Sequence, residues 1–140
     1  DLLRIAAADA MGSVYGYAVG LDMTRRDLQG EMKKMGRPWE IGKAFERSAP
    51  ISPLVPIEES GPLDQGRIEL HVNGEPKQDG DLNQMIWKVP EMISYLSEYF
   101  ELAAGDVILS GTPAGVGAIQ KGDTMLAKVE GLQDFEVKVV

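Results

Sequence analysis

The sequence predicts an α+β domain, built mainly of mixed or antiparallel β-sheet with two or three short helices. Short apolar or alternating runs are separated by glycine, proline and asparagine, as in strands joined by tight turns. Runs with helical spacing are few and short. The chain has 140 residues, 44% of them hydrophobic and 26% charged, which fits one domain with a core of its own.

The first predicted elements are a helical turn, a strand and a helix. Residues 6–11 are rich in alanine and favour a single helical turn. Residues 15–21 form an apolar run interrupted by glycine, which predicts a buried strand. A helix is predicted over residues 24–35, where Thr24 and Asp27 have the spacing of a capping hydroxyl and a first-turn carboxylate.

The middle of the chain predicts a hairpin. Residues 51–57 contain two prolines and predict an edge or irregular strand. Residues 67–72 alternate between apolar and polar side chains, and Asn73 and Gly74 follow them as a strong hairpin signal. The return arm is predicted over the polar residues 75–78.

The last third predicts one more helix and three strands. The helix begins at Val89, with a proline in its first turn and apolar residues at helical spacing. Residues 107–110 predict a buried strand, which leads into a glycine-rich loop over residues 111–117. Residues 125–130 and 135–140 predict two further strands joined by a glycine turn.

Charge and composition exclude several classes of function. The net charge of −8 argues against a generic nucleic-acid or membrane surface, because both require clustered lysine and arginine. The absence of cysteine excludes disulfides, thiolate metal sites and cysteine nucleophiles. No membrane-length apolar stretch or signal peptide is found, so the expected location is the cytoplasm. The single histidine, His71, is expected to be solvated beside Glu69 on the outward face of its strand.

The first candidate site consists of Asp22, Arg26, Asp27, Gln29 and Lys43. Arg26 and Gln29 are three residues apart and share one helix face, close to the strand end at Asp22. A hard divalent ion prefers carboxylate oxygens, but Asp22 alone cannot hold one, and the chain has no Glu-x-Glu or His/Asp cluster. The alternative interpretation is a capped helix with solvated charges and a surface lysine.

The loop over residues 111–117 is the second candidate site. Its glycine spacing matches neither a dinucleotide fingerprint nor a P-loop, so nucleotide binding is not predicted. A tight loop after a strand can present the hydroxyl of Thr112 and bare amides to a substrate carboxylate. The alternative is a plain structural turn.

Taken together, these segments resemble the fumarylacetoacetate hydrolase family, most closely its acylpyruvate or fumarylpyruvate hydrolase branch. The combination of Asp-x-Thr-x-Arg-Asp-x-Gln with Gly-Thr-Pro-x-Gly-Val-Gly is specific, and the matches cover nearly the whole chain in the family's order. The matching segments are residues 17–29, 42–45, 72–75, 85–87 and 105–117.

The resemblance implies a β-roll fold and a metal-dependent hydrolase of aromatic catabolism. Its substrate would be a 1,3-dicarbonyl acid such as fumarylpyruvate, cleaved at a carbon–carbon bond to a carboxylic acid and pyruvate. The resemblance also implies Mg²⁺ or Mn²⁺ held by three carboxylates. The residues that match the family's site are the catalytic Lys43, Arg26 and Gln29, the substrate-binding Thr112, Gly111 and Lys43, and the metal ligand Asp22.

The family's remaining metal ligands and its His/Glu lid pair precede the segment that matches residues 1–11. Residues 1–140 are therefore expected to be the C-terminal part of the catalytic domain, without tight metal binding or turnover on their own. The same site also fits oxaloacetate decarboxylation or isomerisation of a related dicarbonyl. A catalytically inactive binding module is the alternative if the chain is complete. The resemblance implies a homodimer, with a small dicarbonyl acid as ligand and neither nucleic acid nor membrane as partner.

Overall fold

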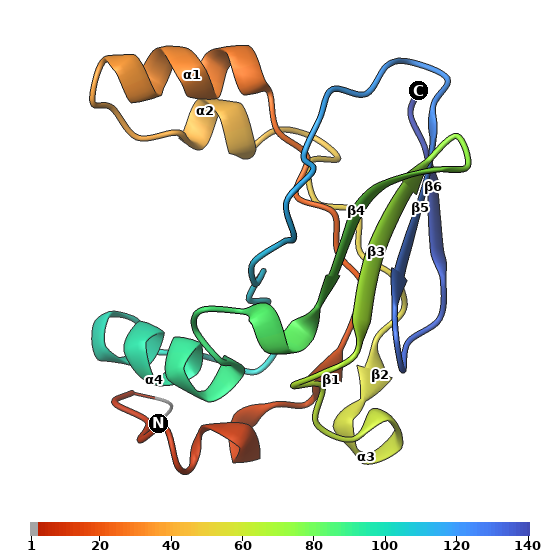
Figure 1. Ribbon diagram of the computed structural model, residues 1–140. Helices are drawn as coiled ribbons and strands as arrows, with labels where there is room; N and C mark the ends of the chain where they lie inside the picture. Colours follow the sequence, from red (N-terminus) through yellow and green to blue (C-terminus); the bar gives the residue numbers. More distant parts are fainter. Residues whose placement is uncertain (1–2) are drawn as a thin grey trace.

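The structure is a computed structural model that describes residues 3–140, and it confirms an α+β fold (Figure 1). Four strands pair antiparallel in the order β4-β3-β5-β6, and a separate short pair joins β1 to β2. The strands are β1 (Gly16–Tyr17), β2 (Val55–Pro56), β3 (Arg67–Val72), β4 (Glu75–Asp81), β5 (Thr124–Val129) and β6 (Phe135–Lys138).

The helices lie beside the sheet, with α1 and α2 at one end of the molecule and α4 at the other (Figure 1). They are η1 (Ala10–Ser13), α1 (Arg26–Lys34), α2 (Glu40–Lys43), α3 (Ile57–Ser60), η2 (Leu82–Gln84) and α4 (Val89–Tyr99), where η marks 3₁₀ geometry. The sequence predicted α1 and α4. It missed α2 and α3, because a single helical turn carries little periodic signal.

The hairpin of β3 and β4 confirms the strongest local prediction. Asn73 and Gly74 have φ values of 53° and 83°, both positive, as a two-residue hairpin turn of this type requires. β4 continues to Asp81, beyond the predicted return arm. Its polar sequence is tolerated because β4 is the outer strand of the sheet and part of it faces solvent.

The predicted buried strand over residues 15–21 is wrong in extent and in burial. Only two residues pair in β1, followed by a single bridge at Gly20. Tyr15 is 73% exposed, whereas Val19 is buried. The partner segment, residues 51–56, contains prolines that lack a backbone donor, so the ladder between the two segments is interrupted. The irregular strand predicted there is confirmed.

Helix α1 ends where the sequence predicts but does not start there. Gly36 follows its end with a φ of 63°. The predicted cap at Thr24 is wrong, because the N-cap position is Arg25 and no side chain caps the helix. The hydroxyl of Thr24 instead accepts a hydrogen bond of 2.9 Å from Lys43 Nζ. The hydroxyl that the local spacing assigned to the helix cap therefore accepts from a lysine that is distant in the sequence.

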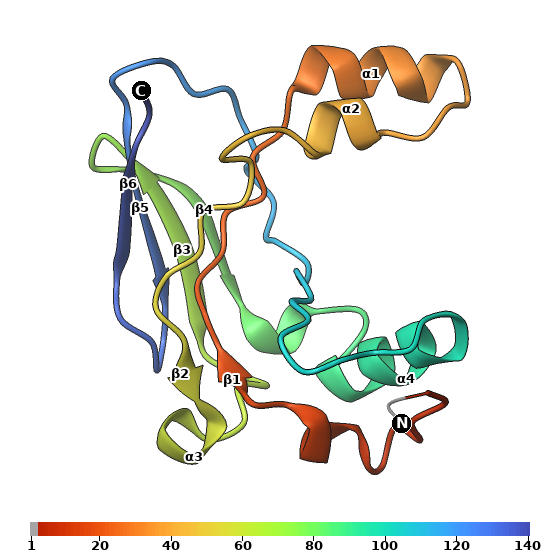
Figure 2. The same ribbon diagram turned by 180° about the vertical axis from the view of Figure 1, so that it is seen from behind.

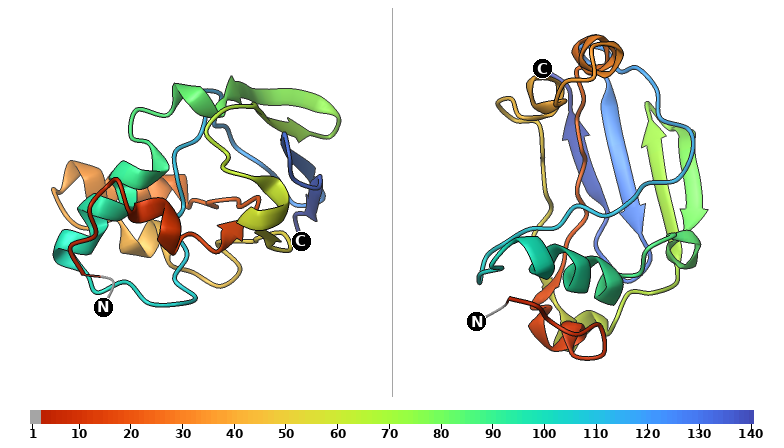
Figure 3. Two further views of the ribbon diagram at one scale, coloured as in Figure 1. Left: turned by 90° about the horizontal axis from the view of Figure 1, so that it is seen from below. Right: turned by 90° about the vertical axis from the view of Figure 1, so that its left-hand side faces the viewer.

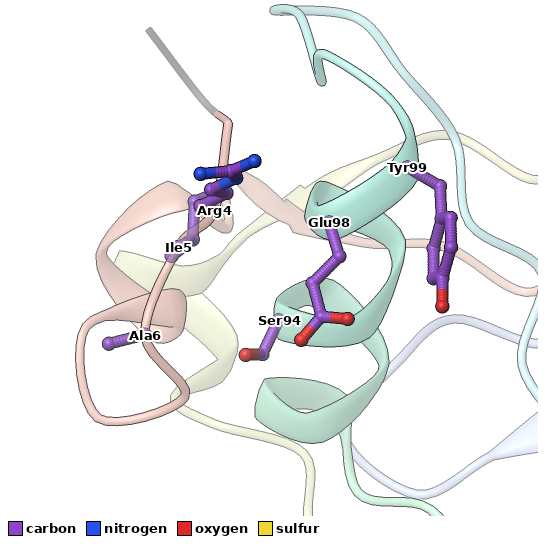
Figure 4. Close-up of a pocket in the computed structure, with 6 residues that line it drawn as sticks. All are labelled: Arg4, Ile5, Ala6, Ser94, Glu98 and Tyr99. Atoms are coloured by element: carbon purple, nitrogen blue, oxygen red, sulfur yellow. The ribbon is translucent and has the colours of Figure 1, made fainter.

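The N-terminal segment lies beside α4 (Figure 4) and is hydrogen-bonded to it. The amide of Arg4 donates to the Ser97 carbonyl, and the amide of Ile5 donates to the Ser97 hydroxyl, both at 2.8 Å. The helical turn predicted over residues 6–11 is a turn followed by a 3₁₀ helix from Ala10. So short an alanine run cannot sustain an α-helix without tertiary support.

The strand predicted over residues 107–110 is wrong. This segment is extended but pairs with no strand in the part of the chain that the structure describes. Figures 2 and 3 show that the chain after α4 runs past the sheet toward the end of the molecule with α1 and α2 before it enters β5. Val107 is 66% exposed and Leu109 47%. A strand needs a second backbone to pair with, and an apolar run alone does not supply one.

His71 is half-buried, not solvated as predicted, although it does contact Glu69. Its Nε2 lies 3.3 Å from Glu69 Oε1, and its side chain is 23% exposed. β3 is an inner strand, so His71 has cross-strand neighbours on both sides, Pro76 of β4 and Leu126 of β5. These two neighbours shield the imidazole, which the alternation of a single strand does not reveal.

Asn73 also ties the hairpin to the start of β5. Its side-chain amide donates to Asp123 Oδ1 at 2.8 Å, and its side-chain oxygen accepts from the Thr124 amide at 2.9 Å. The Gln120 amide donates to Asp123 Oδ2 at 2.7 Å. These hydrogen bonds, first that of Asn73, hold the pKa of the Asp123 carboxyl below its ordinary value.

We therefore expect Asp123 to contribute to the acid dependence of stability. A carboxyl whose pKa is lower in the folded state stabilises it above the unfolded pKa, and this stabilisation disappears as the pH falls through the folded pKa. On acidification below about pH 4, the unfolding free energy should fall more steeply in the wild-type protein than in an Asp123→Asn variant. Urea titrations at a series of pH values test this. Identical pH dependence of the two proteins would contradict it.

Candidate active site

The structure contains a groove of about 980 Å³ between the sheet and two extended segments. Its floor comes from β3 and β5, with the apolar Ile68, Leu70 and Met125 among its residues. Its walls are residues 17–27 and residues 108–119, which touch where Leu109 packs against Gly20. Its lining includes most of the predicted site, namely Asp22, Arg26, Lys43, Gly111 and Thr112, together with Thr24, which was predicted only as a helix cap.

A second hollow, of about 470 Å³, lies between the N-terminal segment and α4 (Figure 4). Arg4 and Glu98 line it, but in Figure 4 the guanidinium and the carboxylate point in different directions. Binding sites bring a few polar groups together in one concave place. The groove has this property and the second hollow does not, so the groove is the candidate site.

Asp22 is carried on a segment whose backbone is held on both sides of it. The amide of Leu21 donates to the Pro50 carbonyl at 3.0 Å, and the amide of Met23 donates to the Ser48 carbonyl at 2.8 Å. These bonds extend the pairing that begins at the Gly20 bridge. The carboxylate thus stands on fixed backbone directly before α1, as predicted from the strand-to-helix junction.

Lys43 reaches Asp22 because α2 packs closely on α1. Gly42, the residue before Lys43, is buried against the backbone of the first turn of α1. A side chain at Gly42 would place its Cβ 3.0 Å from the Gln29 amide nitrogen and 3.2 Å from the Arg25 carbonyl oxygen. The amide of Arg25 also donates to the Gly42 carbonyl at 2.9 Å. Gly42 therefore allows α2 to pack closely on α1, and this packing places the ammonium of Lys43 beside Asp22.

The ammonium of Lys43 binds two oxygens at the mouth of the groove. Its Nζ lies 2.7 Å from Asp22 Oδ2 and 2.9 Å from Thr24 Oγ1. The side chains of Lys43 and Asp22 are 33% and 52% exposed, so both remain accessible from the groove. An ion pair this exposed adds only about 0–1 kcal/mol to stability. Because the Asp22–Lys43 ion pair adds little to stability and lines a large groove, we infer that its role is chemical.

Arg26 and Gln29 are joined to each other, and only Arg26 lines the groove. Arg26 Nη1 donates to Gln29 Oε1 at 2.7 Å, which confirms that the two residues share a helix face. Gln29 lies on α1 beside Gly42 and orients the guanidinium from behind. The structure thus brings Asp22 and Lys43 together, places Arg26 in the lining of the same groove, and leaves Gln29 outside that lining.

Thr112 is held by a residue that the sequence analysis missed. Gln78 of β4 donates from Nε2 to Thr112 Oγ1 at 2.8 Å and to the Pro113 carbonyl at 2.6 Å. Gln78 was read as part of a polar return arm, but its side chain is buried. The local sequence pattern does not distinguish a buried polar residue of an outer strand from an exposed one. Only the fold brings residues 78 and 112 together.

Asp22 is the candidate ligand for a hard divalent ion among the carboxylates that line the groove, which also include Asp27 and Glu69. Asp22 supplies carboxylate oxygens, the ligand type that Mg²⁺ and Mn²⁺ prefer. Among residues 3–140, no group of three histidine, cysteine, aspartate or glutamate side chains is placed to hold a metal ion. The described residues therefore fit such an ion through one ligand and do not complete its coordination.

Gly42 is expected to tolerate no side chain without loss of the site. In a Gly42→Ala variant the new methyl group meets backbone atoms of α1, which cannot move as a flexible side chain does. We expect the unfolding free energy to fall by about 1–3 kcal/mol, and Lys43 to be displaced from Asp22.

Gly30→Ala is the matched control for this variant, because Gly30 lies within α1 and its Cβ position is open. There the exchange should stabilise the protein by about 0.5–1 kcal/mol. Denaturant titration of both variants measures the contrast. Equal stability of the two variants would contradict the close packing of α2 on α1.

Comparison with known families agrees with this architecture. A family model described as fumarylacetoacetate (FAA) hydrolase, C-terminal, matches residues 1–140. A fumarylpyruvate hydrolase from Ralstonia sp is 44% identical over 136 residues, which are 97% of this chain and 70% of that protein. The oxaloacetate tautomerase YcgM of Escherichia coli (strain K12) is 47% identical over 120 residues, 85% of this chain and 55% of that protein.

A solved structure is similar over nearly the whole chain. The fumarylpyruvate hydrolase from Pseudomonas aeruginosa, in complex with Mn²⁺ and pyruvate, is 54% identical with a TM-score of 0.97. The similarity covers 99% of this chain and 59% of that one. This chain thus spans between about half and 70% of the length of these relatives. A family model matched from end to end, and relatives of this identity, establish that the chain belongs to the fumarylacetoacetate hydrolase family.

Proposed function

We propose that this chain carries the substrate-binding half of the active site of a metal-dependent hydrolase. The reaction is cleavage of a carbon–carbon bond in a 1,3-dicarbonyl acid of the acylpyruvate type, with fumarylpyruvate as the best candidate. The observation that carries the proposal is the Asp22–Lys43 pair at 2.7 Å, in the same groove as Thr112. One wall of the groove thus holds a carboxylate and a cation, and the other holds a hydroxyl.

Asp22 is proposed as one ligand of Mg²⁺ or Mn²⁺. The Pseudomonas relative, 54% identical, is described in complex with Mn²⁺ and pyruvate. When bound, such an ion supplies a Lewis acid that polarises carbonyl oxygens and stabilises developing negative charge. The described residues do not complete its coordination, so we propose that the other carboxylate ligands come from a part of the protein outside residues 1–140.

Lys43 is proposed to stabilise charge on the departing pyruvate fragment. In the hydrolysis, a water oxygen bonds to the acyl carbonyl carbon, and the bond between that carbon and the pyruvate methylene breaks. The pyruvate fragment keeps the electron pair and takes up a proton. A compact ammonium held by Asp22 and Thr24 keeps a positive charge at a fixed position in the groove.

The remaining residues bind and orient the substrate. Thr112 offers a hydroxyl, and Gly111 offers backbone free of a side chain, so the loop can approach a substrate carboxylate closely. Arg26, oriented by Gln29, supplies a second positive charge on the opposite wall. A dicarbonyl acid carries negative charge at its carboxylate and partial charge on its keto oxygens. The two cationic side chains match this pattern.

Oxaloacetate tautomerase is the second candidate activity. The Escherichia coli tautomerase, 47% identical to this chain, favours it, as does the mitochondrial tautomerase FAHD1 of Homo sapiens at 44% over 135 residues. Oxaloacetate is also a dicarbonyl acid, and a base and a cation next to its carbonyl suffice for enolisation. Decarboxylation of oxaloacetate uses the same charge stabilisation, so the residues of the groove serve all three reactions.

Exposed apolar side chains suggest that this unit is covered by further protein. Val107 and Leu109 are exposed although the sequence around them is typical of a core strand. Surfaces of this kind mark contacts with other protein. We propose that they pack against the part of the protein that supplies the missing ligands, and that the complete enzyme is a homodimer. Among the described helices, none is long and apolar enough to cross a membrane.

A substrate comparison tests the proposal. Full-length protein with Mn²⁺ or Mg²⁺ is supplied with fumarylpyruvate or oxaloacetate, and products are followed by NMR. We expect equal amounts of fumarate and pyruvate from fumarylpyruvate, in a metal-dependent reaction. Faster keto–enol exchange of oxaloacetate, without cleavage of fumarylpyruvate, would instead assign the tautomerase activity. Release of CO₂ and pyruvate from oxaloacetate as the faster reaction would assign the decarboxylase.

A further inference from the structure

The Gly-Thr-Pro loop, residues 111–117, is held in place by β4. Residues 111–117 contain no helix or strand. Gly115 has a φ of 105° and lies so close to the Lys77 carbonyl that any side chain would collide with it. Pro113 packs over Gly80, and a Cβ added at Gly80 would lie 3.0 Å from the Cγ of Pro113. The loop thus packs closely against β4, the outer strand of the sheet.

The side chain of Gln78 links this edge of the sheet to the loop by two hydrogen bonds. It is 8% exposed, and its Nε2 lies 2.8 Å from Thr112 Oγ1 and 2.6 Å from the Pro113 carbonyl oxygen. A carbonyl oxygen only accepts, so the atom that faces Pro113 must be the amide nitrogen. The orientation of the Gln78 amide is therefore fixed by chemistry. Both of its hydrogens are used inside the protein.

This orientation determines what the hydroxyl of Thr112 can do. Because Thr112 Oγ1 accepts from Gln78, its own hydrogen is not needed for that contact and is free to donate elsewhere. A hydroxyl that accepts a hydrogen bond is also a stronger donor, because the bonds polarise one another. Thr112 lines the groove, so the donor is available to a ligand there.

We propose that Gln78 is a positioning residue that presents Thr112 as a hydrogen-bond donor and so selects ligands with a carboxylate. The inference rests on the proposed function for the place of the carboxylate, and it adds the residue that sets this preference. A carboxylate accepts such a bond with charge assistance, whereas an ester oxygen accepts it only weakly. The preference for an acid over its ester thus depends on Gln78, a buried side chain that itself borders the groove.

The test compares pyruvate with methyl pyruvate as probes of the full-length protein loaded with Mn²⁺. In a Gln78→Met variant, which keeps the length of the side chain but has no donor, we expect pyruvate to bind about tenfold more weakly. Binding of methyl pyruvate should change by less than about twofold. Gln133→Met, at an exposed position, is the matched control and should change neither affinity. Equal weakening of both probes would mean that Gln78 only supports the fold, and would overturn the inference.

Two further variants keep the test decisive. In Gln78→Glu an ionised carboxylate would accept from Thr112 and turn its hydrogen inward, so pyruvate should bind more weakly than in Gln78→Met. Unchanged pyruvate affinity in Gln78→Glu would refute the inference, even if Gln78→Met fails to fold. In Thr112→Val the donor itself is removed. If pyruvate affinity is unchanged in Thr112→Val, the proposed place of the substrate carboxylate is wrong. If it falls in Thr112→Val but not in the Gln78 variants, only the positioning role is wrong.

Discussion

Replacing Asp22 by asparagine in the full-length protein is expected to lower Mn²⁺ affinity by at least about 100-fold and kcat by about 1,000-fold. Asparagine has nearly the same shape but offers a neutral oxygen and an amide, so it is a poor ligand for a hard divalent ion. It also removes the anionic partner of Lys43, which lies at 2.7 Å in the native protein. Isothermal titration with Mn²⁺ and turnover of fumarylpyruvate measure the two effects.

The fold should survive this change, because the side chain of Asp22 is half exposed and its ion pair is worth little to stability. Asp64→Asn removes an exposed carboxylate that does not line the groove, and it is the matched control. We expect Asp64→Asn to keep native metal affinity and turnover. If Asp22→Asn binds Mn²⁺ as tightly as the wild type, Asp22 is not a metal ligand.

Replacing Lys43 by methionine should lower kcat, as in Asp22→Asn, but should not lower the affinity for Mn²⁺. The aliphatic length is kept and the charge is lost, so stabilisation of the departing fragment disappears and kcat should fall by about 100- to 1,000-fold. Mn²⁺ affinity should stay the same or rise, because the ammonium no longer occupies Asp22 Oδ2. Loss of turnover with metal binding retained distinguishes a charge-stabilising residue from a metal ligand.

Lys34→Met is the control for this variant, because Lys34 is an exposed lysine of α1 that does not line the groove. It should leave kcat unchanged. Lys43→Arg tests geometry, since the planar guanidinium keeps the charge but does not replace a compact ammonium. We expect it to recover only part of the activity. Full turnover in Lys43→Met would remove the lysine from the proposed reaction.

The sequence predicted those parts of the fold in which the signal is local. The alternation of residues 67–72 and the Asn-Gly pair after them define a hairpin within a dozen neighbouring residues, and this hairpin is confirmed. The helix of residues 89–99 is likewise confirmed, because its proline start and apolar spacing lie within one segment. Such elements depend little on the rest of the chain.

The failures that bear on the site involve partners that are distant in the sequence. Thr24 lies one residue before the N-cap of α1, and its hydroxyl accepts from Lys43, nineteen positions further on. Residues 107–110 do not form a strand because no backbone pairs with them among the described residues. Gln78 was overlooked because its role depends on a loop 34 positions away. The roles of Asp22 and Lys43 came from a family resemblance, and their contact could not be derived from spacing alone.

The most direct test of the account is the position of the metal ion in the complete protein. A crystal of the full-length protein grown with Mn²⁺ and pyruvate gives this position from an anomalous difference map. We expect a manganese peak within coordination distance of the Asp22 carboxylate, with pyruvate in the groove between Lys43 and Thr112. A manganese peak elsewhere, with Lys43 still bound to the Asp22 carboxylate and pyruvate outside the groove, would contradict the proposed site.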